Sequence, residues 1–444
     1  MNSKLSRYWD LEKHGTNPRI ELIAGITTFA TMSYILVVQP SMMADAGMNP
    51  RGVMLATALM SAIFTLVSAF YSKMPFALAP GMGSNAIMAY NLVAAGHTTW
   101  QVGVAMFIVT GVILALLTVM GVREDMIRVM PRNIKVGIGA AIGIMIARLG
   151  VKNSGMVKPD FSGAGDFSDP RVQLALIGLL ITLVLHFVQF GKDGKTFKIR
   201  GSMLISILLT TLIGIPMGVV KMPASIFSVD FNSLKEVAFQ PDLKGVFTLQ
   251  MLPFIAFFLF GDFFSTMGTA LGLAGKAELL DKDGNLPGIG RVFMTDAIGT
   301  AVGGVFGITN VQTYVESASG IEAGGRTGMT AFFTAMMFLV AIFFAPLFMM
   351  IPSAATAPVL LLLGCSMLQV LKNVSFGDED WVPLALMILI TAFTGDFVLG
   401  TAVGVVSAVL IGFLVSVFTQ DKSRMPTWGT VIMALVMSIK FFIL

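Results

Sequence analysis

The stretch GGVFGITNVQTYVESASG (303–320) places a carboxylate, Glu316, inside a very apolar chain. Three glycines, Gly303, Gly304 and Gly307, precede a polar run that leads to this acid. An acidic side chain within a membrane span is energetically expensive and is functional by default. Irregular backbone at membrane depth is tolerated only where it lines a cavity or is buried by protein. The stretch therefore predicts an interrupted segment beside a binding site, although Glu316 could also be a structural partner of an arginine or of backbone N–H groups.

A second stretch, MPFALAPGMGSNAIMAY (74–90), is interrupted in a similar way. Pro75, Pro80, Gly81 and Gly83 fall in a span that should be helical, and proline and glycine both break helices. Paired interrupted segments in the two halves of a chain are the best sequence indication of a transporter's binding site. We therefore expect the two stretches to build one site.

The composition predicts a polytopic helical membrane protein. Of 444 residues, 55% are hydrophobic and 12% are charged, about half the charged fraction of a soluble protein. Apolar runs close to a membrane span in length recur from end to end, and the short alternating runs of a β-barrel do not. A single cysteine, Cys365, excludes a disulfide framework, and the scattered histidines predict no metal site. No phosphate-binding loop indicates ATP-driven pumping, the net charge of +4 does not point to nucleic acid, and we expect no cofactor.

The apolar pattern predicts about fourteen membrane segments in an all-α fold. The predicted ranges are 20–41, 52–71, 76–95, 101–121, 132–151, 172–190, 201–220, 248–275, 289–306, 309–321, 327–350, 354–371, 382–418 and 427–443. The range 382–418 is too long for one span and is interrupted at Thr394-Gly395-Asp396. The sequence therefore leaves open whether this range forms one helix or two.

An internal repeat relates MPRNIKVGIGAAIGIMIARLGVKN (130–153) to IPSAATAPVLLLLGCSMLQVLKN (351–373). Both open with an apolar residue and proline, and both end in Lys-Asn. The copies are seven predicted segments apart, as the fifth and the twelfth. An odd number of segments per repeat inverts the second copy across the membrane. We therefore expect two inverted repeats of seven, with segments three and ten as the interrupted pair.

Lysine and arginine residues predict the orientation in the membrane. The basic N-terminal segment 1–19, Lys73, Arg326 and Lys372 fall on one side of the predicted segments, which should be the cytoplasmic side. Segment 1–19 lacks the apolar core of a cleaved signal peptide. We expect a multi-pass protein of the cytoplasmic membrane with a cytoplasmic N-terminus.

Asp262 is the second candidate for a functional acid, in FFLFGDFFSTMGTALG (257–272). It stands between phenylalanines on a long apolar helix. A hydrogen bond between packed helices is the alternative role, and we favour a place in the cavity. Phe263 is a candidate for stacking on a flat ligand, although most of the 35 phenylalanines must face lipid or core.

Three further polar residues complete the candidate site. Asn85 follows the first interruption and could read the edge of a heterocycle, cap a helix, or do both. Gln312 belongs to the polar run before Glu316. Asp296 opens a glycine-rich span, where a structural role and a place in a proton route are equally favoured.

Four motifs resemble the AzgA-like branch of the nucleobase–ascorbate transporter family, the proton-coupled purine permeases. They are HGTNPRIELIAGITTFATMSYILVVQP (14–40), ALAPGMGSNAIMAY (77–90), GDFFSTMGT (261–269) and TYVESASGIEAGGRTGMTA (313–331). The resemblance implies a core domain from 20–121 and 248–350. It also implies a gate domain from 130–220 and 351–444, with substrate bound between the two domains.

The resemblance further implies that Asn85, Asp262 and Glu316 contact the substrate. The chain departs from the family at Ser265, where a second acid is usual. We predict uptake of a purine, hypoxanthine, guanine or adenine, with a proton carried by Asp262 in preference to Glu316. The alternatives are another heterocycle, an anion, or a sensor that does not transport. A homodimer in the lipid bilayer is a candidate assembly, because the glycine-rich segments favour close packing.

Overall fold

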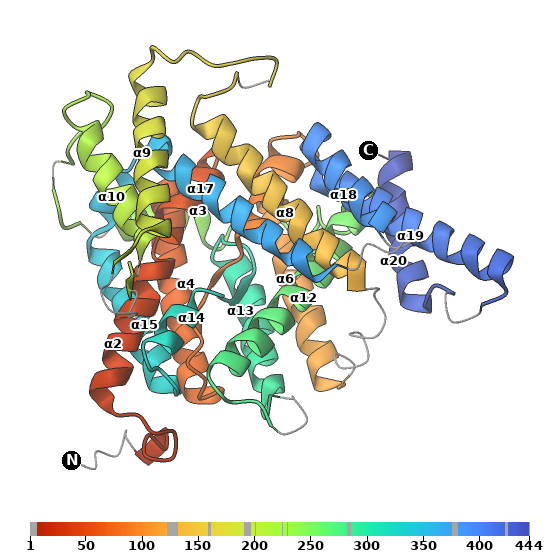
Figure 1. Cartoon of the computed structure of the whole chain (residues 1–444), viewed down its shortest axis with the longest axis horizontal. Helices are drawn as coiled ribbons and strands as arrows, with labels where there is room; N and C mark the ends of the chain where they lie inside the picture. Colours follow the sequence, from red (N-terminus) through yellow and green to blue (C-terminus); the bar gives the residue numbers. More distant parts are fainter. Residues whose placement is uncertain are drawn as a thin grey trace.

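The computed structural model describes residues 7–121, 132–158, 161–190, 197–199, 201–223, 225–228, 230–281, 286–374, 381–421 and 425–443 (Figure 1). The described chain is mostly helical. The first half contains α2 (Pro18–Met32), α3 (Ile35–Asp45), α4 (Pro50–Tyr71), β1 (Leu78–Pro80), α5 (Met82–Ala86), the π-helix η1 (Ile87–Val93), α6 (Trp100–Val119), α8 (Arg132–Asn153), α9 (Pro170–Phe187), β2 (Gln189–Phe190), β3 (Phe197–Lys198) and α10 (Ser202–Gly214). The second half contains α11 (Phe231–Val237), the 3-10 helix η2 (Leu249–Met251), α12 (Leu252–Lys276), α13 (Ile289–Val305), β4 (Val311–Thr313), α14 (Ser317–Glu322), α15 (Gly328–Phe343), α16 (Ala345–Met349), α17 (Ser353–Met367), the 3-10 helix η3 (Leu368–Asn373), α18 (Trp381–Thr394), α19 (Phe397–Thr419) and α20 (Trp428–Ile443).

Several helices begin where the local sequence supplies a cap. Asn17 and Asn49 accept backbone N–H bonds at the starts of α2 and α4, and Asp169 does so at the start of α9. Each cap is followed by proline, which lacks the N–H that would have no partner in the first turn. The caps place the helix starts two residues before the predicted ranges 20–41, 52–71 and 172–190.

The helices have the lengths and compositions of membrane spans. Six spans in the described part of the chain are long and apolar enough to cross a bilayer, including Pro18–Asp45, Leu249–Lys276 and Phe397–Thr419. Five shorter apolar helices accompany them. The first span is predicted as one helix over 20–41, but it changes from α2 to α3 at Ser33 and Tyr34.

Helices from the two halves of the chain pack against each other. α4 packs on α15 and α6 on α13, whereas α8 packs on α17 and α18. A methyl group at Gly111 of α6 would lie 2.4 Å from the backbone nitrogen of Ala301 in α13, so these helices touch through their backbones. Figure 1 shows α9 and α10 on one side of the molecule and α18, α19 and α20 on the other, with α8 and α17 between them.

The range 382–418 forms two helices, α18 and α19, which pack against each other. Gly395 lies between them with φ at +72°, a left-handed conformation that glycine adopts without steric cost. Asp396 then caps α19 by accepting from the backbone N–H of Leu399. Of the two alternatives that the sequence left open over 382–418, the structure has two helices, and α20 follows them over the predicted range 427–443.

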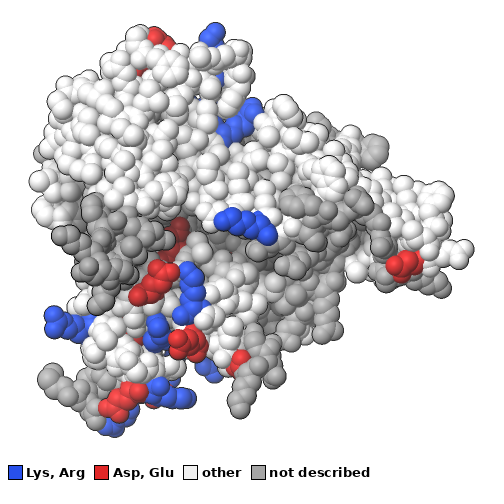
Figure 2. Space-filling model, viewed as in Figure 1, with Lys and Arg blue, Asp and Glu red and all other residues white. Residues whose placement is uncertain are grey.

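On the face drawn in Figure 2, many charged side chains gather near the N-terminal end. Figure 2 shows most lysines, arginines and acids on the visible face near the N-terminus, with a largely uncharged surface beyond. Lys73 lies at this end and donates to the backbone carbonyl of Tyr8. The basic residues Lys422 and Arg424 lie outside the described residues.

Candidate functional site

Two short strands from the two halves of the chain meet at the centre of the site. β1 pairs antiparallel with β4, with Leu78 opposite Thr313 and Pro80 opposite Val311. These strands belong to the two interrupted stretches of the sequence, so the structure brings the two stretches together as predicted. The short helices α5 and α14 follow the two strands, so each stretch changes from extended to helical beside its partner.

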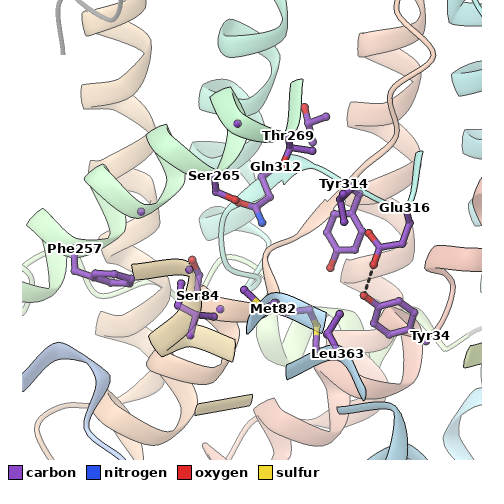
Figure 3. Close-up of a pocket in the computed structure, with 18 residues that line it drawn as sticks. Tyr34, Met82, Ser84, Phe257, Ser265, Thr269, Gln312, Tyr314, Glu316 and Leu363 are labelled. Carbon is purple, nitrogen blue, oxygen red and sulfur yellow. Dashed lines mark hydrogen bonds between the residues drawn. The ribbon is translucent and has the colours of Figure 1, made fainter. Parts of the chain in front are cut away.

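A cavity of about 620 Å³ borders this pair of strands (Figure 3). Its wall comes from the junction of α2 and α3, the start of α5, one face of α12, the stretch from Gln312 to Glu316, and parts of α8 and α17. The volume is within the usual range for sites that bind small molecules. Glu316 is the one charged side chain among the described residues of the wall.

Glu316 is held by a tyrosine from the first helices of the chain. The Tyr34 hydroxyl donates to Glu316 Oε1 at 2.7 Å, across the cavity edge (Figure 3). Tyr34 is 1% exposed, so this bond is shielded from water. This hydrogen bond fixes the position of the Glu316 carboxyl group at the wall.

Gln312 also borders the cavity, and a chain of polar contacts runs behind it. Asn310 Nδ2 donates to Gln312 Oε1 at 3.2 Å and to Asp262 Oδ1 at 2.5 Å. Asp262 also accepts from the Thr300 hydroxyl at 3.4 Å. Asp262 is buried behind the wall and does not line the cavity, so it reaches the cavity through Asn310 and Gln312.

Asp296 is fully buried and anchors the strand β4. Its Oδ2 accepts from the Thr313 backbone N–H at 3.0 Å and from the Thr266 hydroxyl at 2.7 Å. The Thr313 hydroxyl approaches both carboxylate oxygens, at 3.2 and 3.3 Å. These contacts tie β4 to α12 and α13, which matches the structural role that the sequence left open for Asp296.

Asn85 lies on α5, where it is fully buried. The Thr309 hydroxyl donates to Asn85 Oδ1, which joins the two interrupted stretches a second time. Asn85 Nδ2 is buried without a hydrogen-bond partner among the described residues. The residue is outside the cavity wall and next to it, since Ser84 and Met82 line the wall from the same helix.

Phe263 lies away from the cavity. Its ring packs in a cluster with Leu114 and Ala297, and the Phe293 ring is 6.3 Å from it. The phenylalanine that borders the cavity from α12 is Phe257, which contacts the Phe397 ring of α19 at 4.6 Å. The structure thus offers Phe257 as the aromatic surface for a ligand.

The sequence analysis missed Tyr34 as a site residue. Tyr34 stands in the apolar run TMSYILVVQP, and it is one of only five tyrosines in the chain. A polar tip in an otherwise apolar span is a signal that could have singled it out. Ser265 and Thr269 line the cavity from α12, and Thr269 has no role in the predicted site.

Comparison with known proteins identifies the family. A family model described as Permease family (Xan_ur_permease) matches residues 19–411. An adenine permease of Escherichia coli, AdeQ, is 35% identical over 91% of this chain and 89% of its own. A guanine/hypoxanthine permease of Bacillus subtilis, PbuO, is 34% identical over 89% of this chain and 92% of its own. The chain belongs to the nucleobase–ascorbate transporter family.

Solved structures show the fold of this family member. The transmembrane domain of a cyanobacterial bicarbonate transporter, BicA, is similar with a TM-score of 0.62 and 17% identity, over 87% of this chain and 97% of that one. The murine anion transporter Slc26a9 in its inward-facing state is similar with a TM-score of 0.60 and 12% identity, over 90% of this chain and 68% of that one. The protein is thus a multi-pass membrane protein with a transporter fold.

Proposed function

We propose that this permease carries a purine nucleobase, hypoxanthine, guanine or adenine, across the cytoplasmic membrane together with a proton. The observation that carries the proposal is the cavity beside the paired strands, with Glu316 as its one charged wall residue among those described. Curated relatives along nearly the whole chain transport adenine or guanine and hypoxanthine by name, which supports a purine as the substrate.

The polar groups of the wall suit a neutral heterocycle. Glu316 accepts ring N–H groups, Gln312 and the Ser265 hydroxyl serve ring acceptors, and Phe257 offers an apolar face. An anion is disfavoured, although two solved relatives of the fold carry anions by title, because the described wall holds a carboxylate and no basic side chain. Asn85 remains a candidate contact because its buried Nδ2 has no hydrogen-bond partner among the described residues. Phe257, which borders the cavity, replaces Phe263 as the proposed aromatic contact.

We assign the coupled proton to Glu316 in preference to Asp262 and Asp296. All three acids lie around β4, but only Glu316 borders the cavity, where a proton can arrive from water and leave with the substrate. A carboxylate that must be desolvated by the substrate favours its protonated form, which couples the two binding events.

Alternating access then follows from the way the cavity is enclosed. Its wall joins elements of the proposed core, α5, α12 and β4, to elements of the proposed gate, α8 and α17. Movement of one set against the other opens the cavity to either side of the membrane. We also propose a cytoplasmic N-terminus, in line with the lysines and arginines that Figure 2 shows near that end, and leave a homodimer as a candidate assembly.

The test is uptake of radiolabelled hypoxanthine, guanine and adenine in permease-deficient cells, with and without a protonophore. We expect protonophore-sensitive uptake that is lost in Glu316→Gln. Glu322→Gln is the matched control, because Glu322 lies on α14, the helix that Glu316 precedes, but is exposed and pairs with Lys276 at 3.1 Å. Failure to take up any purine, with the protein in the membrane, would overturn the proposal.

A further inference from the structure

We propose that Asp262, acting through Asn310, fixes the Gln312 side chain as a hydrogen-bond donor, so that the cavity selects ligands by an acceptor atom. This inference rests on the proposed function and concerns the same cavity. It makes Asp262 a positioning residue and Gln312 a residue that determines specificity.

The first step is the orientation of Asn310. An ionised carboxylate can only accept hydrogen bonds, so the group that Asn310 presents to Asp262 must be its amide nitrogen. The contact of 2.5 Å between Asn310 Nδ2 and Asp262 Oδ1 has this polarity. The Thr300 hydroxyl donates to the other oxygen, Oδ2, so Asp262 is met by donors at both oxygens.

The second step is the orientation of Gln312. The same Asn310 nitrogen donates its second hydrogen to Gln312 Oε1 at 3.2 Å. The two atoms of an amide lie on opposite sides of its carbon, so engagement of the oxygen turns Gln312 Nε2 away from Asn310. Because Gln312 borders the cavity, the group left to meet a ligand is an N–H donor.

The third step is the space in which the two amides lie. A methyl group at Gly81 would be 2.8 Å from both Asn310 Oδ1 and Gln312 Nε2. Only glycine at this position leaves both amide groups undisturbed. The backbone of Gly81 also donates to the carbonyl of Asn310 at 3.0 Å, which holds the residue against β4.

The consequence is a rule for the ligand. A ring nitrogen or carbonyl oxygen facing Gln312 forms a hydrogen bond, whereas an N–H or C–H there leaves a desolvated donor without a partner. Loss of one such bond lowers affinity by about 5- to 150-fold. The rule concerns one position on the purine, and it is independent of the contacts that Glu316 makes.

The test uses analogues in which one acceptor of the purine is removed. Uptake of whichever labelled purine the wild type transports is competed by that purine and by its 3-deaza and 7-deaza analogues, with C–H in place of ring nitrogen. If the transported purine is hypoxanthine or guanine, unsubstituted purine serves as the analogue that lacks the 6-carbonyl acceptor. In the wild type we expect one analogue to inhibit about 5- to 150-fold more weakly than the parent. The quantity compared is the inhibition constant of this analogue divided by that of the parent purine. This ratio does not depend on the amount of protein in the membrane.

The variants distinguish the roles of the three residues. Gln312→Met keeps the length of the side chain and removes its donor, so the ratio should fall to about one. Asp262→Asn offers both a donor and an acceptor to Asn310 and no longer fixes its polarity, so the ratio should fall as well. Asp296→Asn is the matched control: it makes the same change in a buried acid that holds Thr313, and it should lower uptake without changing the ratio.

Each outcome decides the proposal. An unchanged ratio in Gln312→Met overturns the role of Gln312. An unchanged ratio in Asp262→Asn overturns the positioning role of Asp262, and if uptake by this variant also loses its protonophore sensitivity, Asp262 is a proton carrier instead. Should Asp262→Asn fail to reach the membrane, Asn310→Ser interrupts the same chain of contacts and carries the same expectation. Absence of any purine uptake in the wild type would overturn the proposed function itself, and this inference with it.

Discussion

Gly81 provides the sharpest test of the site, because alanine fits the backbone there and does not fit the neighbouring side chains. Gly81 has φ at −69°, which any residue adopts without strain. The added methyl group would meet Asn310 Oδ1 and Gln312 Nε2 at 2.8 Å and Asn310 Nδ2 at 2.9 Å. Gly81→Ala therefore changes the contacts of two amides and little else.

The magnitude follows from these distances. Ordinary van der Waals contact begins at 3.4 Å, so each amide must retreat by roughly half an ångström. The bond of 3.2 Å between Asn310 and Gln312 is already at the long limit, and this shift breaks it. Loss of that bond and of the aligned contact between Gln312 and the ligand costs about 1–3 kcal/mol, which raises KM roughly 5- to 150-fold. The groups that move are ends of side chains, so the fold should keep its stability.

The assay measures initial uptake rates against substrate concentration and the melting temperature of the detergent-purified protein. We expect KM to rise while the melting temperature stays within about two degrees of the wild type. Gly272→Ala is the control, because Gly272 lies on α12 with no atom within 4 Å of an added methyl group. An unchanged KM in Gly81→Ala would refute the placement of the two amides beside Gly81.

Two further predictions concern Glu316 and helix packing. Tyr34→Phe removes a hydrogen bond to a carboxylate, worth about 1.5–3 kcal/mol, and should reduce uptake more than Tyr314→Phe, which loses a bond to the Pro80 carbonyl worth about 0.5–1.5 kcal/mol. Equal uptake rates in the two variants would contradict this ranking. Gly111→Ala forces α6 and α13 apart at a cost of about 1–3 kcal/mol and should lower the melting temperature. Gly290→Ala, with open space around the added methyl group, should not, and equal melting of the two variants would count against the backbone contact.

Much of the fold could be predicted from the sequence, because breakers interrupt apolar runs at places that a membrane tolerates only beside a cavity. Pro80 and Gly81 in one stretch and Gly307 in the other predict that helices stop there. Pro80 is the last residue of β1, and Gly307 lies between the end of α13 and the start of β4. The sequence could not predict that the two stretches pair as strands, since each is only three residues long. A strand pattern has no periodicity to detect over such a length.

The site was less predictable than the fold. Glu316 and Gln312 line the cavity as expected, whereas Asp262 and Phe263 face elsewhere on α12. Both lie near Ser265 in the sequence, and helix periodicity alone does not say which face of this largely apolar helix is turned to the cavity. Tyr34 comes from a helix junction with no breaker of its own, so its approach to Glu316 depends on tertiary packing that the sequence does not display.

The pairing of β1 with β4 has a consequence for biosynthesis. The ribosome completes β1 long before it reaches β4, so the first interrupted stretch must wait in the membrane with its strand edge unpaired. Closing so large a loop is slow, because contacts distant in sequence form late in folding. Nascent chains that end before Val311 should thus insert their early helices and lack the strand pair that borders the cavity. Until β4 is synthesised, the inserted permease therefore carries an unpaired strand edge, which the cell's quality control can recognise.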